Sequence, residues 1–150
     1  MEKKIDETDL ELLRLLEKNA KMRIHTISRK MGIPSSTVHH RIKRLEQDGL
    51  ICGWTIRKSY PLLGLGMKAH ILVNVDVAAL KKMKRTQRDV ATDIRKLEAV
   101  EGVDIVTGDA DLLVTVRARD MEAFQNILLE KLQSIEGITK TKTMIVVSES

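Results

Sequence analysis

Two short helices separated by a glycine constrain this chain more than any other feature of its sequence. In ISRKMGIPSSTVHHRIKRLEQDGL, residues 27–50, apolar side chains recur every three or four positions on both sides of Gly32, so each helix has one buried stripe. Glycine can adopt the left-handed conformation that ends one helix and lets the next cross it steeply. Pro34 fits the first turn of the second helix, and Ser35 or Ser36 could cap it. The pattern predicts a helix-turn-helix.

The outward side chains of the second predicted helix are polar or basic. Near the start of such a helix they can reach base edges or phosphates, and further along they can neutralise the DNA backbone. The predicted DNA-binding residues are Ser35, Ser36, Thr37, His39, His40, Lys43 and Arg44. A solvated basic face on an ordinary helix pair is the alternative, and Gly32 with Pro34 favours DNA binding. If His39 and His40 contact phosphate, acidification would tighten DNA binding.

The net charge of +5 lies entirely in the first sixty residues. Residues 1–60 contain 13 Lys and Arg against 8 Asp and Glu, whereas residues 61–150 contain 13 of each kind. A basic excess confined to one domain favours a polyanionic partner for that domain and predicts steep salt dependence. A membrane is not the expected partner, because the sequence has no long apolar run, no basic helix with aromatic anchors and no signal sequence. We therefore expect a cytoplasmic protein.

The first predicted domain spans residues 1–60 and is a winged helix-turn-helix. A helix over Asp6–Lys18 would support the pair, with Asp6 as its cap, and the alternation of Leu50–Ile56 predicts a strand after it, the wing. Proline and glycine crowd SYPLLGLG, residues 59–66, which predicts a hinge reaching to about residue 67. Cys52 is the single cysteine, so an intrachain disulfide and a cysteine metal cluster are excluded.

Residues 68–150 have a different pattern of apolar residues, in which strands and helices are mixed, and form the second predicted domain. The expected elements are strand Ala69–Val77, helix Arg88–Leu97, strands Val100–Thr107 and Leu112–Val116, helix Met121–Ser134 and strand Ile138–Val147. This βαββαβ order predicts a ferredoxin-like domain, in which two helices cover one face of a four-stranded antiparallel sheet, and places the chain in the α+β class. The uncovered face needs a partner, so we expect a dimerisation domain.

Four segments resemble the Lrp/AsnC, or feast/famine, family of transcriptional regulators. They are IDETDLELLRLLEKNAK, the helix-turn-helix ISRKMGIPSSTVHHRIKRLEQDGLI, the VEGVDIVTGDADLLV hairpin and the terminal IEGITKTKTMIVV strand. The resemblance implies a homodimer that binds double-stranded DNA and assembles into an octamer, with an amino-acid effector held between dimers beside the hairpin. A dimeric reader of this kind requires a roughly palindromic operator. Arg23 and Pro34 depart from the family, which usually has a serine or threonine at the first position and a serine at the second, so the base contacts stay open.

An amino acid presents an ammonium and a carboxylate, so its pocket needs acidic acceptors beside backbone or hydroxyl donors. Asp109 and Asp111 could meet the ammonium, Gly108 could let backbone come close, and Thr141 and Thr143 could supply hydroxyls. A plain hairpin turn and ordinary strand threonines would show the same residues. With the resemblance, we predict the effector site at these five residues, and no other cofactor and no metal.

Motifs of common enzyme classes are missing from the sequence. It has no GxSxG, no phosphate-binding glycine loop, no HExxH and no Cys/His pair at ligand spacing, so we expect no catalytic residues. The main alternative is an enzyme like the sirohaem decarboxylases, which resemble this family in their two-domain fold. Such an enzyme needs converging cations in its ligand domain, where the charge here is balanced. A third interpretation, an amino-acid sensor or adaptor without DNA contact, leaves the basic excess unexplained.

Overall fold

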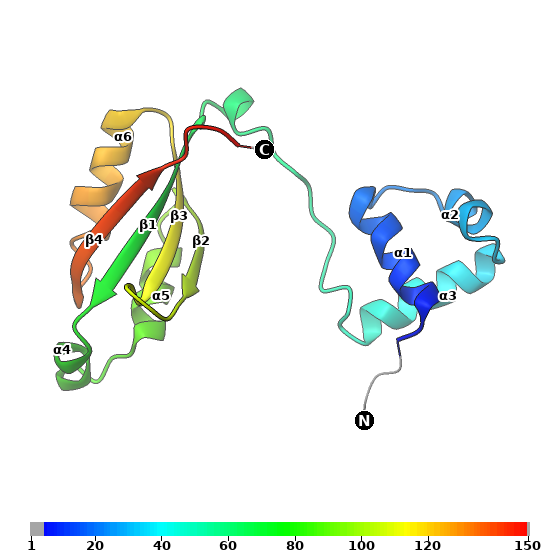
Figure 1. Ribbon diagram of the computed structural model, residues 1–150, viewed down its shortest axis with the longest axis horizontal. Helices are drawn as coiled ribbons and strands as arrows, with labels where there is room; N and C mark the ends of the chain where they lie inside the picture. Colours follow the sequence, from blue (N-terminus) through cyan, green and yellow to red (C-terminus); the bar gives the residue numbers. More distant parts are fainter. Residues whose placement is uncertain (1–4, 150) are drawn as a thin grey trace. The chain divides into compact units, whose positions relative to one another are not determined.

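A computed structural model describes residues 5–149, and the chain divides between Arg57 and Lys58 into two compact units (Figure 1). Unit 1 contains the helices α1 (Glu7–Lys18), α2 (Ile24–Met31) and α3 (Ser35–Gln47). Unit 2 contains the sheet and the remaining helices. No helix among the described residues is long and apolar enough to cross a membrane.

The three helices of unit 1 pack around a small aliphatic core. The fully or almost fully buried members of this core are Leu12, Leu16, Ile27, Val38 and Leu45. Asp6 caps α1 as predicted, because its carboxylate accepts a hydrogen bond from the backbone N–H of Asp9 at 2.8 Å. The Asp9 carboxylate accepts in return from the Asp6 N–H at 3.2 Å, which completes a capping box.

The turn between α2 and α3 confirms the role predicted for Gly32. Its φ of +66° is left-handed, and its N–H closes the end of α2 on the Ser28 carbonyl. The predicted capping of α3 by Ser35 or Ser36 is wrong. Pro34 has φ −58° and an extended ψ of 144°, so it is the N-cap itself and α3 begins at Ser35 without a side-chain cap. A capping side chain must come from the non-helical residue before the helix, and proline has no such group.

The strand predicted over Leu50–Ile56 is wrong. The N–H groups of Leu50 and Ile51 turn back to the Leu45 carbonyl at 2.9 and 3.0 Å, which closes the end of α3. Residues 52–59 then run without helix or strand. A strand needs a neighbour to exchange backbone hydrogen bonds, and within the described residues none lies beside this segment.

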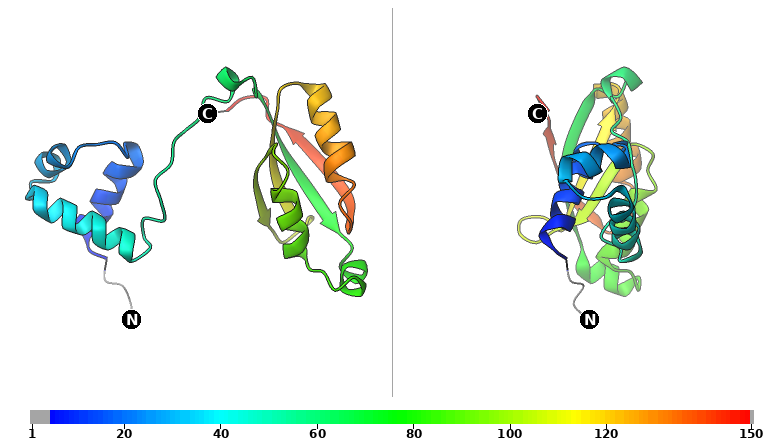
Figure 2. Two further views of the ribbon diagram at one scale, coloured as in Figure 1. Left: turned by 180° about the vertical axis from the view of Figure 1, so that it is seen from behind. Right: turned by 90° about the vertical axis from the view of Figure 1, so that its right-hand side faces the viewer.

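Unit 2 has the ferredoxin-like architecture that the sequence predicts. Its strands are β1 (Met67–Val75), β2 (Val100–Ile105), β3 (Leu112–Ala118) and β4 (Ile138–Ile145), and the antiparallel sheet has the order β2-β3-β1-β4. One face is covered by α5 (Gln87–Arg95) and α6 (Met121–Asn126), as Figure 2 shows. Helix α6 continues as a π-helical stretch, η2 (Ile127–Leu132). A short helix after β1, α4 (Val77–Lys82), was not predicted. The strand ends before Asp76, whose carboxylate caps α4 by accepting a hydrogen bond from the Ala79 N–H at 2.9 Å.

Alternate residues of β1 face opposite sides of the sheet. Ala69, Ile71, Val73 and Val75 are buried against the helices. The intervening residues, half-buried in this single chain, belong to the open face, which no helix of the described residues covers.

The proline- and glycine-rich segment before β1 contains a short 3-10 helix, η1 (Pro61–Leu63), which Gly64 ends at φ +71°. Tyr60, just before η1, has its ring 4.0 Å from the guanidinium carbon of Arg117 in β3. This contact attaches the start of the segment to the sheet of unit 2.

Candidate nucleic-acid interface and effector site

The outward face of α3 carries most of the residues predicted to bind DNA. Residues three or four positions apart on a helix share one side, so Ser36, His39, His40 and Lys43 form one strip. The exposed members of the predicted set are Ser35, Ser36, His39, His40 and Lys43, and the half-buried ones are Thr37 and Arg44. Val38 and Leu45 on the opposite side are fully buried and hold α3 on the core.

The beginning of α3 is open as well as exposed. No side chain caps it, so the N–H groups of its first turn lack the partner that a serine or aspartate cap would supply. The N-terminus of a helix carries a partial positive charge and attracts phosphate groups. The geometry therefore presents backbone donors beside the hydroxyls of Ser35 and Ser36.

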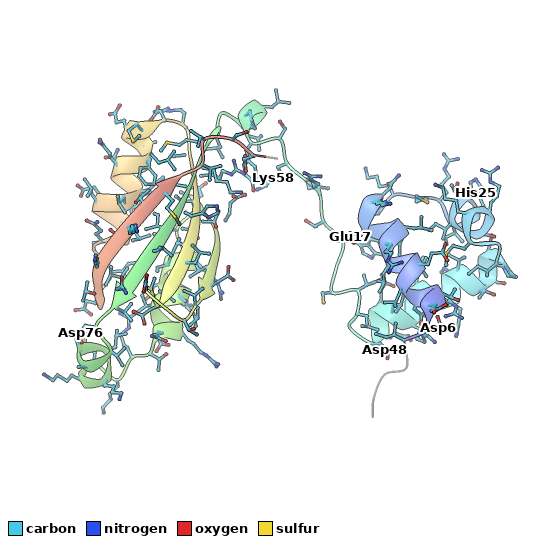
Figure 3. All side chains as sticks on the ribbon, viewed as in Figure 1. Asp6, Glu17, His25, Asp48, Lys58 and Asp76 are labelled. Atoms are coloured by element: carbon cyan, nitrogen blue, oxygen red, sulfur yellow. The ribbon has the colours of Figure 1, made fainter. Side chains whose placement is uncertain are left out.

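Two arginines of α3 are held by carboxylates of unit 1. Arg41 Nη1 lies 2.7 Å from Asp9 Oδ1 and 2.7 Å from Asp6 Oδ2, and Arg44 pairs with the other oxygen of Asp9. Asp9 is fully buried, whereas Asp6 lies beside α3 at the surface (Figure 3). The hydrogen bond from Arg41 is the main cause that holds the pKa of Asp6 below its ordinary value.

These ion pairs change which residues of α3 we expect to contact DNA. The guanidinium of Arg44 is partly engaged with Asp9, so its predicted DNA contact would compete with an ion pair inside the unit. Lys43 has no carboxylate partner among residues 5–149 and is the freest positive charge on the helix. The sequence predicts only a capping role for Asp6 and none for Asp9 or Arg41. The Asp-x-x-Asp spacing at the start of α1 indicates the capping box but not the ion pairs.

The predicted effector residues lie in two places, the turn between β2 and β3 and the helix-covered side of β4. Gly108 has φ +123°, a conformation that favours glycine. The Asp111 carboxylate accepts hydrogen bonds from the Val75 N–H at 2.9 Å and from Gln87 Nε2 at 2.8 Å. Asp111 therefore ties the turn to the end of β1 and the start of α5. The carboxylate of Asp109 is exposed, and its backbone carbonyl accepts from Asn74 Nδ2 at 2.9 Å.

Thr141 and Thr143 are half-buried and share a face of β4, as predicted. They pair with the buried Val73 and Ile71 of β1, so they lie on the helix-covered side. Thr141 Oγ1 accepts a hydrogen bond from Gln133 Nε2 at 2.8 Å.

The chain therefore does not gather all five predicted effector residues at one point. The Asp111 N–H donates a hydrogen bond to the Val73 carbonyl, and Val73 pairs with Thr141 of β4. Val73 therefore lies between the turn and the threonines, which are about 10 Å apart, or two strand spacings. A cavity of about 680 Å³ lies elsewhere, at the end of the sheet where β2 begins and β3 ends, and none of the five residues lines it.

Two family models match the chain, and together they cover most of it. Residues 5–51 match a winged helix-turn-helix DNA-binding model, and residues 71–150 match the Lrp/AsnC ligand binding domain. An HTH-type transcriptional regulator of Pyrococcus furiosus is 43% identical over 141 residues, which are 94% of this chain and 91% of the relative. The HTH-type transcriptional regulator FL11 of Pyrococcus abyssi is 34% identical over 142 residues, 95% and 89% of the two chains.

Solved structures show the same architecture. E. coli AsnC has a TM-score of 0.85 at 26% identity and covers 98% of this chain and 95% of its own. A transcriptional regulator of Neisseria meningitidis, solved as a complex with L-Met, has a TM-score of 0.88 at 27% identity, with coverage of 97% and 92%.

Proposed function

This chain belongs to the Lrp/AsnC family of transcriptional regulators, and we propose that it reads a two-fold symmetric DNA site through α3 and responds to an amino acid. The observation that carries the proposal is the exposed strip Ser36, His39, His40 and Lys43 on a helix whose N-terminus has no side-chain cap. The relatives reported above are named as transcriptional regulators, which favours this role over an enzyme of the sirohaem decarboxylase kind.

In the proposed complex, the first turn of α3 points its backbone donors at a phosphate, together with the hydroxyls of Ser35 and Ser36. Ser36 and His39, which follow on the exposed strip, read base edges in the major groove. His40 and Lys43 lie further along and neutralise the DNA backbone, and Thr37 and Arg44 contribute from the flank of the helix. Phosphate contacts set the register, whereas base contacts supply the sequence preference.

A homodimer is the proposed reading unit, formed through the open face of the sheet. This face combines apolar and polar side chains, so it can pack on a copy of itself while retaining hydrogen-bonding groups. Its members include Lys68, His70, Leu72 and Asn74 from β1, Leu113, Thr115 and Arg117 from β3, and Lys140, Lys142 and Met144 from β4. A two-fold dimer presents two copies of α3, which is why we expect a palindromic operator. The resemblance to the family extends the proposal to an octamer of four dimers.

The proposed effector site is the turn between β2 and β3, completed by a neighbouring subunit. The exposed carboxylate of Asp109 is available for the ligand's ammonium, and Asp111 holds the turn in place through Val75 and Gln87. Gly108 keeps the backbone accessible. Thr141 and Thr143 lie away from the turn of their own subunit, so in this proposal they supply hydroxyls to the turn of a neighbouring one. The ligand-binding family model over residues 71–150 and the L-Met complex of the Neisseria regulator support an amino acid as the ligand. An amino acid that favours one assembly state shifts the spacing of the α3 pairs offered to DNA.

A gel-shift titration tests this function. The chain is titrated on the DNA upstream of its own gene and on unrelated DNA, at two salt concentrations, with and without a pooled amino-acid mixture. The proposal predicts preferential, salt-sensitive binding that the pool alters. Binding without sequence preference under every condition contradicts the proposal and favours the enzyme alternative. Preferential binding that the pool leaves unchanged contradicts the effector part alone.

The same titration with Asp109→Ala locates the effector. We expect this variant to bind DNA as the wild type does without amino acids and to lose the response to the pool. Glu136→Ala, an exposed carboxylate before β4, is the matched control and should keep the response. A full response in Asp109→Ala would place the effector elsewhere.

A further inference from the structure

The cavity of about 680 Å³ in unit 2 is distinct from the proposed effector turn. Its walls come from three parts of the unit: the segment before β1, the start of β2 with the end of β3, and α6 with η2. β2 and β3 run from this cavity to the turn, and six strand residues rising about 3.3 Å each separate the two places by roughly 20 Å. The volume is in the range of small-molecule sites, about 300–1,000 Å³.

Part of the cavity wall is apolar. Its aliphatic residues are Leu65, Ala99, Val100, Ala118, Ala123 and Ile127, and the ring of Tyr60 lies among them. Short side chains such as alanine leave room for the body of a ligand instead of filling the space themselves. The wall therefore suits an aliphatic or aromatic group.

The side chains that line the cavity include four cations and two carboxylates, a net charge of +2 before partners outside the wall are counted. Arg117 is neutralised by Glu101 and Glu149 at 3.0 and 2.8 Å, and Arg119 pairs with Asp120, which lies outside the cavity. Of the remaining charged side chains in the wall, Lys58 and Lys131 are positive and Glu98 is negative. Lys131 has no carboxylate partner among the residues that the structure describes.

The π-helical stretch η2 aligns polar groups on the cavity. Its hydrogen bonds join residues five apart, which brings Asn126 and Lys131 to the same side of the helix, and both line the cavity with Ile127. π-helical turns are rare and occur frequently at functional sites. An amide and an ammonium on one side of a helix provide two donors for a carboxylate.

We propose that this cavity binds a small organic monocarboxylate, with its carboxylate at Lys131 and Asn126 and its apolar body against Tyr60, Ala118 and Ala123. Tyr60 connects the site to the rest of the chain. The ring centroid is 5.0 Å from the Lys58 ammonium and 4.0 Å from the Arg117 guanidinium carbon, and Lys58 is the first residue of unit 2 after the stretch that leads back to unit 1 (Figure 3). A bound ligand thus contacts the residue that attaches this stretch to unit 2. The proposed site needs neither DNA nor the amino-acid effector.

The chain has a single tyrosine, so 3-fluorotyrosine labelling of the full-length protein gives one ¹⁹F resonance, at the cavity wall. Sodium hexanoate is the probe, and hexan-1-ol, hexylamine and inorganic phosphate are matched controls that lack the charge, reverse it or lack the apolar body. We expect a saturable shift with hexanoate and a much smaller shift with each control. A response to hexylamine, hexan-1-ol or phosphate as large as that to hexanoate overturns the proposal, as does the absence of a saturable shift.

Single substitutions test where hexanoate binds. Lys131→Ala should weaken hexanoate binding on the order of fivefold, which is the strength of an exposed ion pair, whereas Lys82→Ala, an exposed lysine of α4, should leave it unchanged. Asp109→Ala at the effector turn should also leave it unchanged. Equal binding by Lys131→Ala and Lys82→Ala, or loss of binding in Asp109→Ala, contradicts a carboxylate site at η2.

Discussion

Among residues 5–149, each unit contains one buried charged side chain with two partners of opposite charge, but the signs are reversed. In unit 1 the buried group is a carboxylate, Asp9, fully inaccessible to solvent and paired with Arg41 and Arg44. In unit 2 it is a guanidinium, Arg117, whose side chain is 7% exposed and paired with carboxylates from β2 and from the C-terminal segment. Removing one member of a buried pair is costly because the other charges lose their compensation.

The two clusters differ in what they hold. The Asp9 cluster joins α1 directly to α3, the helix that presents the proposed DNA-binding residues. The Arg117 cluster joins Tyr60, β2 and Glu149, and it lies at the opposite end of the sheet from the turn at Gly108. Stability and DNA recognition are therefore coupled in unit 1, whereas in unit 2 the stabilising cluster is separate from the proposed amino-acid effector turn.

The largest expected effect is that of Asp9→Ala. It removes two ion pairs and half of the α1 capping box, and leaves two arginines without their buried partner, so unit 1 should lose about 3 kcal/mol of unfolding free energy. Urea unfolding followed by the fluorescence of Trp54, the single tryptophan, reports on this unit. Glu11→Ala, an exposed acid on the same helix, is the control. A loss below about 1 kcal/mol for Asp9→Ala would contradict the role given to this cluster.

Arg117→Ala should come next, with a loss of about 2 kcal/mol in unit 2. The effect is smaller because Glu101 and Glu149 are partly exposed and can be solvated when the guanidinium is gone. Urea unfolding followed by circular dichroism of the sheet measures it, with Arg88→Ala on the surface of α5 as the control. If Arg117→Ala lowered the stability reported by Trp54 fluorescence by the same amount, the two units would not be independent. The comparison between their two buried clusters would then not hold.

Lys43→Ala and Arg44→Ala separate DNA contact from stability within α3. Lys43 has no carboxylate partner among the described residues, so its removal should lower affinity for all DNA sequences by roughly fivefold and reduce the salt slope by about 1, without changing the Trp54 transition. Arg44→Ala should also destabilise unit 1, by about 1 kcal/mol, because it removes a partner of Asp9. Fluorescence anisotropy against salt, with urea unfolding of both variants, makes the test. An unchanged salt slope in Lys43→Ala, or unchanged stability in Arg44→Ala, would contradict this division.

The smallest expected effect is the pH dependence that Glu149 gives to unit 2. The hydrogen bonds from Arg117 and Lys68 lower the pKa of Glu149 from 4.5 to about 2. Because the folded state has the lower pKa, the stabilisation by Glu149 is fully present above pH 4.5 and is lost as the pH falls towards 2. The thermal midpoint of unit 2 should therefore differ between wild type and Glu149→Gln at pH 6, and the difference should vanish near pH 2. Two curves that stay parallel over this range would contradict it.

The parts of the fold that were predictable have local signals. Gly32 between two apolar stripes identifies the helix-turn-helix, and the alternation in AHILVNV identifies β1, because side-chain periodicity depends only on the element itself. The wrong strand at Leu50–Ile56 shows the limit of this reasoning. Alternation describes a backbone that can pair but does not supply the neighbour with which it pairs. The short helix α4 was missed because VAALKK continues the apolar run of β1, and only the Asp76 cap separates them.

The candidate sites divide in the same way. The outward position of Ser36, His39, His40 and Lys43 follows from helical period alone. The pairing of Asp9 with Arg41 and Arg44 joins residues more than thirty positions apart, so it depends on how α1 packs on α3 and was not predictable from spacing. The engagement of Asp111 by Val75 and Gln87 is also a tertiary contact. It makes Asp111 a residue that positions the turn, where the sequence suggested only a ligand for the ammonium.

The most direct test of the central claim, that the exposed strip of α3 reads sequence, is the specificity ratio of a Ser36→Ala, His39→Ala double variant. Dissociation constants are measured by fluorescence anisotropy at one salt concentration on the DNA upstream of the protein's own gene and on unrelated DNA. The account predicts that specific binding falls by about tenfold or more while binding to unrelated DNA is nearly unchanged, so the ratio collapses. Equal weakening on both DNAs, with the ratio preserved, would contradict a base-reading role for this strip.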